Sequence, residues 1–444
     1  MDTLIANVTA VTMNEKMEVL FGAYLGIEEG KIAYIGKTAP EDAPKTIIDG
    51  TGMVAIPGLV NCHTHLPTAI LRNLLDDATK ADALKELLHR QSKMDERAGR
   101  AATRLAIAEC LRFGITSVSD LYYSPEITAE IAAEIGIKAN VALAATRFVD
   151  DSEEFDFETD PGCRSLVKAV EKWHNYDGGR IKIDAGIHAE YTSNHLLWEA
   201  LSAYALEKGL RIQLHLSETE QEVADCEERT GMTPAELLNC HGVFKVPATA
   251  AGGAHLTEIE QKILGKAKAS LVAMPIAAAK QGYAPTPITD CVKNGMNVAL
   301  GTDSAVASGN LDMFEVMRMV ALQARQAGGD PEGMPAVAPL MMATVCGATA
   351  QGRSAECGML KEGMDADIAL VDFSAPHLMP CHNVISSLVF SAKGGDVAMT
   401  MVRGKILYQN GQFPTIDLKA VVSEMMEYGI PKIMNDRQGG EHAE

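Results

Sequence analysis

The strongest constraint on the fold is an alternation of short apolar runs with amphipathic stretches between residues 58 and 350. The apolar runs have the length and β-branched content of strands that are buried on both faces, and the stretches between them have a helical period. The eight predicted strands cover residues 58–65, 115–122, 137–148, 181–189, 210–218, 248–256, 269–275 and 296–304. Eight such strands, each followed by a helix, predict a (β/α)8 barrel of the TIM type.

The segments on either side of this region predict a second, smaller unit. Residues 3–56 are typical of short strands with Gly-marked turns, and strand-like runs return at 366–373 and 396–411. Because GKILYQNGQ near one end resembles GKIAYIGK near the other, we expect the two ends to pair. The predicted α/β chain has a composite β-sandwich domain over 1–57 and 358–420, a barrel over 58–357, and a C-terminal helix and tail over 421–444.

Composition and charge exclude several classes of protein. A formal net charge of −20 argues against binding a nucleic acid polymer, which needs a basic surface. The sequence contains no apolar run of the ~18 residues that span a membrane, and its start lacks the pattern of a signal peptide. The nine cysteines form no CxxC pair and are typical of reduced thiols, so we expect a cytoplasmic protein. Aromatic residues make up only 5%, so few aromatic walls are expected in a pocket.

Several polar side chains fall at the C-terminal ends of predicted strands, which meet at one rim of such a barrel. His63 and His65 end the first strand, and because side chains alternate along a strand, both imidazoles point to the same face. His215 lies at the end of the fifth strand and Asp303 at the end of the eighth. This set of ligands predicts one divalent metal ion, Zn by preference, with Fe or Mn as alternatives.

Four segments resemble one known family: PGLVNCHTH, HLSETE, GTDSAVASGNLDMFEVMR and GMLKEGMDADIALVDF. The sequence resembles the amidohydrolase superfamily over essentially the whole chain. Within it, the chain is most similar to the deaminases of methylthioadenosine and S-adenosylhomocysteine and to their triazine chlorohydrolase relatives. The resemblance implies that His63, His65, His215 and Asp303 are the metal ligands. Family members with two metals use a carboxylated lysine at the end of strand four. Here Lys182 lies inside that strand, so a single metal is expected.

The resemblance also implies an enzyme that acts on non-peptide C–N bonds of cyclic amidines. It would release ammonia from a purine, an adenosine derivative or a related N-heterocycle by attack of metal-bound hydroxide. Asp303 would hold the water and accept its proton. Glu218 would be the proton shuttle, for which it needs the raised pKa that an enclosed pocket gives. The alternative for Glu218 is a carboxylate that stabilises a helix N-terminus.

Two further residues match positions that contact the substrate in the family. His188 matches one that hydrogen-bonds the substrate ring, and Arg147 matches one that meets the distal group of the substrate. The alternatives are a structural histidine and an exposed cation at a strand end. A small heterocyclic molecule is therefore the expected partner, and a homo-oligomer is a family-level expectation.

Three departures from the family pattern leave other functions open. Gly252 occupies the position of the usual strand-six histidine, and His255 aligns with a second histidine of that block. Strand seven ends in Val272-Ala273-Met274-Pro275 where the family has a polar segment, and a tryptophan is missing from 77–91. The alternatives are a hydrolase with another leaving group, such as chloride, an alkylamine or a ring amide, and a catalytically weakened metal-binding homologue. Either His255 or a water could stand in for the missing histidine.

Overall fold

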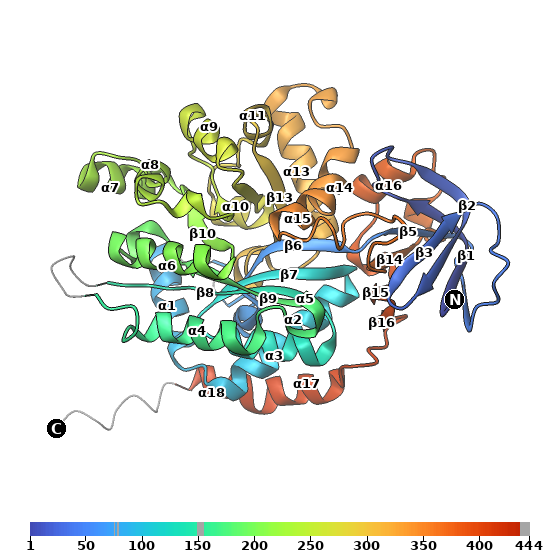
Figure 1. Cartoon of the computed structure of the whole chain (residues 1–444), viewed down its shortest axis with the longest axis horizontal. Coiled ribbons are helices and arrows are strands. Elements are labelled where there is room, and N and C mark those ends of the chain that lie inside the picture. Colours follow the sequence, from blue (N-terminus) through green and yellow to red (C-terminus); the bar gives the residue numbers. More distant parts are fainter. Residues whose placement is uncertain (75, 78–79, 149–154, 436–444) are drawn as a thin grey trace.

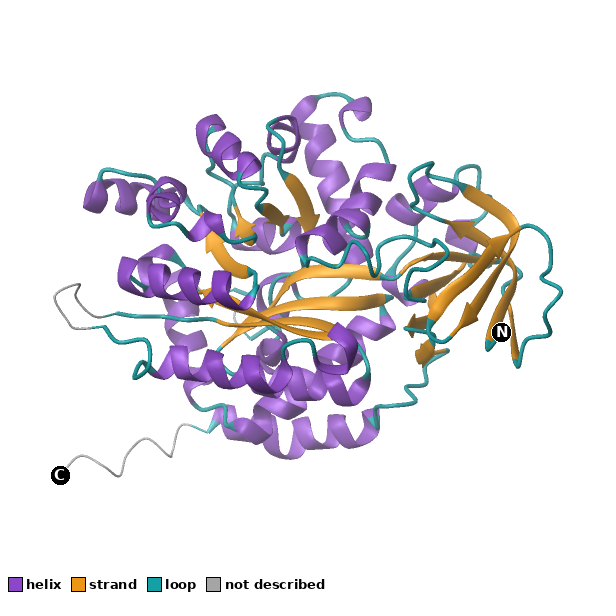
Figure 2. Cartoon of the chain, in the orientation of Figure 1, coloured by secondary structure: helices purple, strands orange, loops and turns teal. Residues whose placement is uncertain are grey.

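The computed structural model of the chain describes residues 1–74, 76–77, 80–148 and 155–435. Its larger part is a barrel of parallel strands that pair in chain order (Figures 1 and 2). The strands are β6 (Leu59–Thr64), β7 (Ile115–Tyr122), β8 (Lys138–Leu143), β9 (Ile181–Ile187), β10 (Ile212–Leu216), β11 (Ala248–Gly252), β12 (Ser270–Ala273) and β13 (Asn297–Leu300). The first and last strands meet where the Asp303 N–H donates to the His63 carbonyl at 3.0 Å. The predicted (β/α)8 barrel is confirmed.

The strands are buried on both faces because helices cover the barrel from outside. All eight residues of β7, for example, are buried. The helices of the barrel are α1 (Lys80–Ser92), α2 (Glu96–Arg112), α3 (Pro125–Ile135), α4 (Pro161–Trp173), α5 (Tyr176–Gly179), α6 (His195–Lys208), α7 (Glu220–Thr230), α8 (Pro234–Cys240), α9 (Glu258–Lys266), α10 (Pro275–Gln281), α11 (Ile288–Lys293), α12 (Ala305–Ser308), α13 (Met313–Gly328), α14 (Val337–Met342) and α15 (Val345–Ala350). Many begin at a side-chain cap, as at Asp95, whose carboxylate accepts from the Ala98 N–H at 3.0 Å.

The smaller part is a sheet built from both ends of the chain, as expected (Figure 1). Its strands run in the order β16-β15-β14-β5-β1-β2-β3, with β4 beside β1. Their bounds are β1 (Thr3–Val11), β2 (Val19–Glu28), β3 (Lys31–Gly36), β4 (Thr46–Asp49), β5 (Met53–Pro57), β14 (Ile368–Asp372), β15 (Val397–Val402) and β16 (Lys405–Gln409). The ends join through antiparallel pairing of β5 with β14, whereas the two similar segments form β3 and β16 at opposite edges.

One branched sheet forms both layers of this small domain. The start of β1 pairs with β4 and its end pairs with β5, so the sheet divides along β1. Leu25 and Ile32 on one arm share a buried cluster with Ile368 and Met399 on the other. The apolar faces of the two arms therefore enclose one core, and the expected two-layer packing arises without two separate sheets. Helix α16 (Val384–Phe390) lies in the connection between β14 and β15.

The C-terminal segment is helical and packs against α2. It comprises α17 (Leu418–Glu424), a π-helical turn over Met425–Gly429 and α18 (Ile430–Met434). The Arg97 guanidinium pairs with Glu424 and lies 3.8 Å from the centre of the Tyr428 ring. The predicted C-terminal helix begins three residues earlier than expected, at Leu418, and residues 436–444 of the predicted tail lie outside the described residues.

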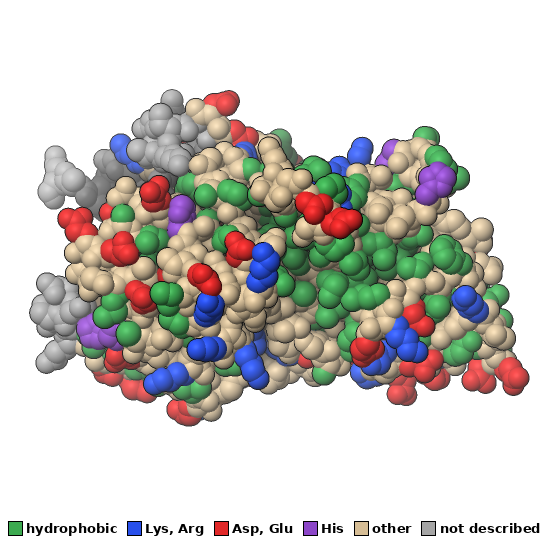
Figure 3. Space-filling view, turned by 90° about the horizontal axis from the view of Figure 1, so that it is seen from above, with side chains coloured by type: hydrophobic (Ala, Val, Ile, Leu, Met, Phe, Trp, Pro, Cys, Tyr) green, Lys and Arg blue, Asp and Glu red, His purple; other side chains and the backbone are tan. Residues whose placement is uncertain are grey.

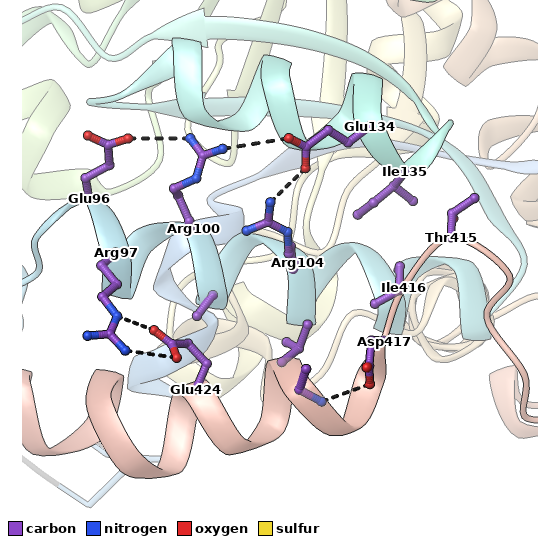
Figure 4. A pocket seen from close by; sticks show the side chains of 13 residues that line it. Glu96, Arg97, Arg100, Arg104, Glu134, Ile135, Thr415, Ile416, Asp417 and Glu424 are labelled. Atoms are coloured by element: carbon purple, nitrogen blue, oxygen red, sulfur yellow. Dashed lines mark hydrogen bonds and ion pairs between the residues drawn. The ribbon is translucent and has the colours of Figure 1, made fainter.

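A hollow of about 620 Å³ is lined by α2, the end of α3 and the segment that contains α17 (Figure 4). Its basic side chains, Arg97, Arg100 and Arg104, each pair with a glutamate, so they form a charge network between helices. A view from above shows apolar side chains gathered toward the small domain, and acidic and basic side chains interspersed elsewhere (Figure 3). Among the described residues, no helix has the length and apolarity that crossing a membrane requires.

A buried lysine links the barrel to the small domain and provides a test of this fold. The Lys138 ammonium at the start of β8 lies 2.8 Å from an Asp365 oxygen and 2.6 Å from an Asp367 oxygen. Its side chain is fully buried. We expect Lys138→Ala to lower the free energy of unfolding by about 3–5 kcal/mol, because it leaves the buried Asp367 carboxylate without its cation and removes the fully buried one of the cations around Asp365. Urea denaturation measures this loss.

The control is Lys31→Ala, which removes another partner of Asp365. The Lys31 ammonium lies 3.0 Å from the same carboxylate, but its side chain is 56% exposed. Its loss is expected to cost about 1 kcal/mol or less. An equal loss of unfolding free energy in the two variants would contradict the assignment of Lys138 as the main link between the barrel and the small domain.

Candidate metal centre and active site

Three histidines meet at the C-terminal rim of the barrel. The ligand atoms of His63, His65 and His215 all lie within 4.8 Å of one another. The Nε2 atoms of His63 and His215 are 3.1 Å apart, and Asp303 Oδ1 lies 3.3 Å from His65 Nε2. The structure therefore brings together the four residues that the sequence predicts as metal ligands, from β6, β10 and the segment after β13.

Backbone carbonyls fix the orientation of two of these imidazoles. His65 Nδ1 donates to the Leu121 carbonyl at 2.5 Å, and His215 Nδ1 donates to the His188 carbonyl at 2.6 Å. A neutral imidazole carries one proton, so both rings present the lone pair of Nε2 to the centre. Such outer hydrogen bonds are typical of histidines that bind metals.

The contact between His65 and Asp303 supports a cation at this place. With its proton on Nδ1, His65 turns an acceptor toward a carboxylate oxygen, which is also an acceptor. Burial lowers the pKa of His65, which disfavours the imidazolium that would otherwise satisfy the carboxylate. A metal ion satisfies both acceptors at once, and the imidazole and carboxylate donors suit a divalent transition metal.

The local backbone holds Asp303 in an uncommon conformation. Its φ is +62°, in the left-handed region that few residues other than glycine adopt. Its carboxylate accepts from the Ser304 N–H at 2.5 Å, and the Ser304 hydroxyl caps α12. Burial raises the pKa of Asp303 to about 6. Strain of this kind concentrates at functional sites, and here it orients the carboxylate toward His65.

A buried aspartate on the next strand supports the turn that contains the two histidines of β6. Asp120 accepts hydrogen bonds from the Leu66 N–H at 2.7 Å, the Thr64 hydroxyl at 3.2 Å and the Thr128 hydroxyl at 2.9 Å. These bonds hold the His63-Thr64-His65 segment against β7. The pattern HTH predicted the ligands but gave no indication of this support.

Glu218 follows the fifth strand and is largely buried. Burial, with smaller effects from the Asp303 and Glu222 charges, raises its pKa to about 8. It is therefore protonated at neutral pH. The helix-capping role considered as an alternative belongs to its neighbours instead. Thr219 is the N-cap of α7, and the Glu222 carboxylate accepts from the Ser217 and Glu218 N–H groups at 2.8 and 2.7 Å.

His188 lies beside the histidine cluster. Its ring centre is 5.1 Å from that of His215, and its Nδ1 is 3.1 Å from the Thr192 hydroxyl. Burial, with smaller effects from the charges of His215 and His65, lowers its pKa to about 3, so it is neutral at physiological pH. The structure thus brings His188 to the site, where its carbonyl also orients His215.

Arg147 is engaged mainly by the segment that follows β8. Its guanidinium lies 3.9 Å from an Asp160 oxygen and 5.1 Å from the centre of the Phe155 ring. Its backbone N–H donates to the Thr192 carbonyl at 2.8 Å, which places its main chain next to the His188 segment. The side chain is only 12% exposed, so the alternative of an exposed cation is wrong.

Gly252, which replaces the usual histidine of strand six, differs from the family pattern in its backbone conformation as well as in its side chain. The residue ends β11 with φ at +102°. A Cβ atom there would lie 3.1 Å from Glu218 Cβ and 3.2 Å from the Leu216 carbonyl oxygen. A histidine at this position therefore requires the main chain to move. His255 lines a pocket together with Glu218, and its N–H donates to the Ser217 carbonyl at 3.1 Å.

Two other expectations have clear outcomes. Lys182 is the second residue of β9, near the opposite end of the strand from His188. Its ammonium group donates to the Glu356 carboxylate at 2.6 Å. An aromatic ring lies close to the site. The Tyr122 ring centre lies 6.5 Å from that of His65 and 5.1 Å from that of Tyr123, and the Tyr122 hydroxyl hydrogen-bonds Gln91.

Tyr283 was missed by the sequence analysis. It lines the pocket beside Glu218, and the Glu218 and Asp303 charges add to the effect of burial in raising its pKa. It follows α10 and so does not lie at the end of a strand, which is where the other candidate site residues were predicted. The carbonyls of Leu121 and His188 were also missed, because a backbone group has no signature in the sequence.

Comparison with known proteins agrees with this geometry. The model of the Amidohydrolase family matches residues 54–407. A protein from Thermoanaerobacter pseudethanolicus named 5-methylthioadenosine/S-adenosylhomocysteine deaminase is 34% identical over 95% of this chain and 97% of its own length.

Two solved structures share the fold. An adenosine deaminase from Xanthomonas campestris with bound zinc has a TM-score of 0.89 at 27% identity, over 96% of this chain and 97% of that one. An atrazine chlorohydrolase from Arthrobacter aurescens has a TM-score of 0.87 at 24% identity, over 96% of this chain and 99% of that one. At this identity the likeness shows a common fold and nothing more. The extent of the family match and the identity to the bacterial relative, together with the site geometry, establish that the chain belongs to the amidohydrolase family.

Proposed function

We propose that this protein is a metal-dependent hydrolytic deaminase. It acts on the non-peptide C–N bond of a cyclic amidine and releases ammonia from a purine, an adenosine derivative or a related N-heterocycle. The observation that carries the proposal is the position of Glu218, protonated and largely buried, beside a cluster of three histidines and Asp303. This combination supports the proposal of a proton donor next to a centre that can activate water.

The proposed metal is Zn²⁺, held by His63, His65, His215 and Asp303. Imidazole and carboxylate ligands suit this ion, and the structurally similar adenosine deaminase is described with bound zinc. When bound, such an ion lowers the pKa of water to ~7 and thereby makes hydroxide available at neutral pH.

The residues of the chain divide the proton transfers between them. Asp303, with a pKa of about 6, is ionised at neutral pH and accepts the proton of the attacking water. As the carbon is attacked, the electron pair of the C=N bond moves to the neighbouring ring nitrogen. Glu218 gives its proton to this nitrogen. The amino group takes up the proton that Asp303 accepted and leaves as ammonia, and the hydroxyl on the same carbon returns a proton to Glu218 as the C=O bond forms. His188 is neutral and hydrogen-bonds the ring.

The substrate class follows from the relatives and can be tested directly. Adenosine derivatives altered at the 5′ position come first, because a relative that matches nearly the whole chain is named for two of them. The experiment is an ammonia-release screen over such derivatives, purines, pterins and triazines, with metal content measured by mass spectrometry. Release of chloride or an alkylamine instead of ammonia would favour the other leaving groups. About one bound metal without any turnover would indicate a metal-binding homologue.

Glu218→Gln is expected to abolish turnover while the protein keeps its metal. The amide cannot give up a proton, whereas the histidine cluster is unchanged. The control is Glu220→Gln, which removes a carboxyl group two residues away in the wall of the same pocket. Steady-state kinetics and metal analysis of both variants check the prediction, and turnover by the Glu218 variant would contradict the mechanism.

The pH dependence of kcat/KM reports the protonation of Glu218. Because its pKa is raised to about 8, the acid form is present below pH 8 and is lost as the pH rises through that value. We therefore expect kcat/KM to fall on the alkaline side with an apparent pKa near 8. A profile that stays flat to pH 10 would be inconsistent with a protonated Glu218 as the donor.

A further inference from the structure

A pocket of about 670 Å³ opens beside Glu218. One wall is the start of α7, where Glu218 and Thr219 precede the helix. The opposite wall is the loop over Gly282–Ala284, between α10 and α11. The other wall residues are Glu220, Gln221, Ala224 and His255. A group of the substrate held against Glu218 therefore faces this loop.

The end of β11 contributes only backbone next to Glu218. A Cβ atom on Gly252 would lie within 3.4 Å of both Cα and Cβ of Glu218, so a side chain at this position would require Glu218 to shift by a few tenths of an ångström. The positive φ of Gly252 also disfavours any other residue. Any side-chain hydrogen-bond donor on this side of Glu218 must therefore come from a neighbouring segment.

The loop after α10 is attached to that backbone. The Thr286 hydroxyl donates to the Gly252 carbonyl at 2.9 Å. Gly282, with φ at +70°, ends α10, and the Tyr283 N–H donates to the Ala278 carbonyl at 2.8 Å. Tyr283 is therefore held on both sides in the chain. The bond to Ala278 ties it to α10, and the bond of Thr286 ties the segment after it to the end of β11.

Tyr283 and Glu218 line the same pocket. Burial raises its pKa, and the charges of Glu218 and Asp303 raise it further. The phenol thus keeps its proton and can donate a hydrogen bond within the pocket that it shares with Glu218.

We propose that Tyr283 is a further catalytic residue, whose hydroxyl donates a hydrogen bond to the substrate held beside Glu218, and that Thr286 positions it through the Gly252 carbonyl. This inference rests on the proposed function, because it takes the heterocycle as the group that occupies the pocket. Tyr283 supplies from the loop a polar contact that position 252 does not provide.

Tyr283→Phe tests the proposal by removing only the hydroxyl. Loss of one donor that acts on the reacting atoms costs ~10²-fold or more in kcat, so a fall of that order is expected on an adenosine derivative, together with a rise in KM of about fivefold from the lost hydrogen bond to bound substrate. The matched control is Tyr176→Phe. Tyr176 is 48% exposed and contacts Trp173, and its loss should leave kcat at the wild-type value. An unchanged kcat in Tyr283→Phe would overturn the proposal.

Thr286 gives a second, independent comparison. Thr286→Val removes the bond to Gly252 and should lower kcat, whereas Thr286→Ser keeps the hydroxyl and should restore it. Because Thr286 acts through Tyr283, adding Thr286→Val to Tyr283→Phe should cause little further loss. Full additivity of the two changes would overturn the positioning role. A larger kcat loss in His255→Gln than in Tyr283→Phe would assign the donor to His255 and overturn the role of Tyr283.

A binding measurement separates this inference from the proposed function. Calorimetry with 5′-methylthioadenosine is carried out on Glu218→Gln with and without Tyr283→Phe, where no turnover is expected. Loss of one hydrogen bond should weaken the affinity about fivefold. If the wild type releases no ammonia but the affinity falls in this way, the function fails and the Tyr283 contact stands. If the wild type is active and neither kcat nor affinity changes, the function stands and the contact fails.

Discussion

The site depends on two hydrogen bonds that run between neighbouring strands. His65 on the β6 side donates to Leu121 of β7, and His215 of β10 donates to the carbonyl of His188, just after β9. Each bond decides which ring nitrogen carries the proton, so the order of strands in the barrel determines which lone pairs face the centre. The same strand order brings Asp303 to His63, because β13 closes the barrel against β6. The metal centre is therefore a product of the sheet topology as much as of its side chains.

Burial at this rim gives two carboxyl groups different protonation states. Both carboxyl groups are shielded from solvent, which raises the pKa of Asp303 to about 6 and that of Glu218 to about 8. At neutral pH one group is ionised and the other is protonated, which is the pairing that a base and an acid need in one active site. The start of α7 is capped by the Glu222 carboxylate, which accepts the backbone N–H groups of Ser217 and Glu218.

The sequence predicted the elements that have a periodic or positional pattern. The alternation of strands and helices indicated the barrel, and the ends of its strands indicated the cluster of His63, His65, His215 and Asp303. Three features had no such pattern. The orienting carbonyls belong to the backbone, Tyr283 follows a helix instead of a strand, and the φ of Gly252 cannot be derived from its identity. In the small domain, similarity between two segments correctly predicted that the ends associate, but the pairing strands are β5 and β14, because register depends on long-range contacts.

The meeting of β6 with the segment after β13 has a consequence for how the protein is made. Two of the candidate ligands are near residue 65 and another is at residue 303, so the ribosome must synthesise the whole barrel before the cluster can form. The small domain is completed later still, when β14 pairs with β5. A nascent chain thus presents separate histidines until the segment after β13 has been synthesised, and only then can all four candidate ligands come together. Assembly of the candidate site is in this way coupled to closure of the barrel.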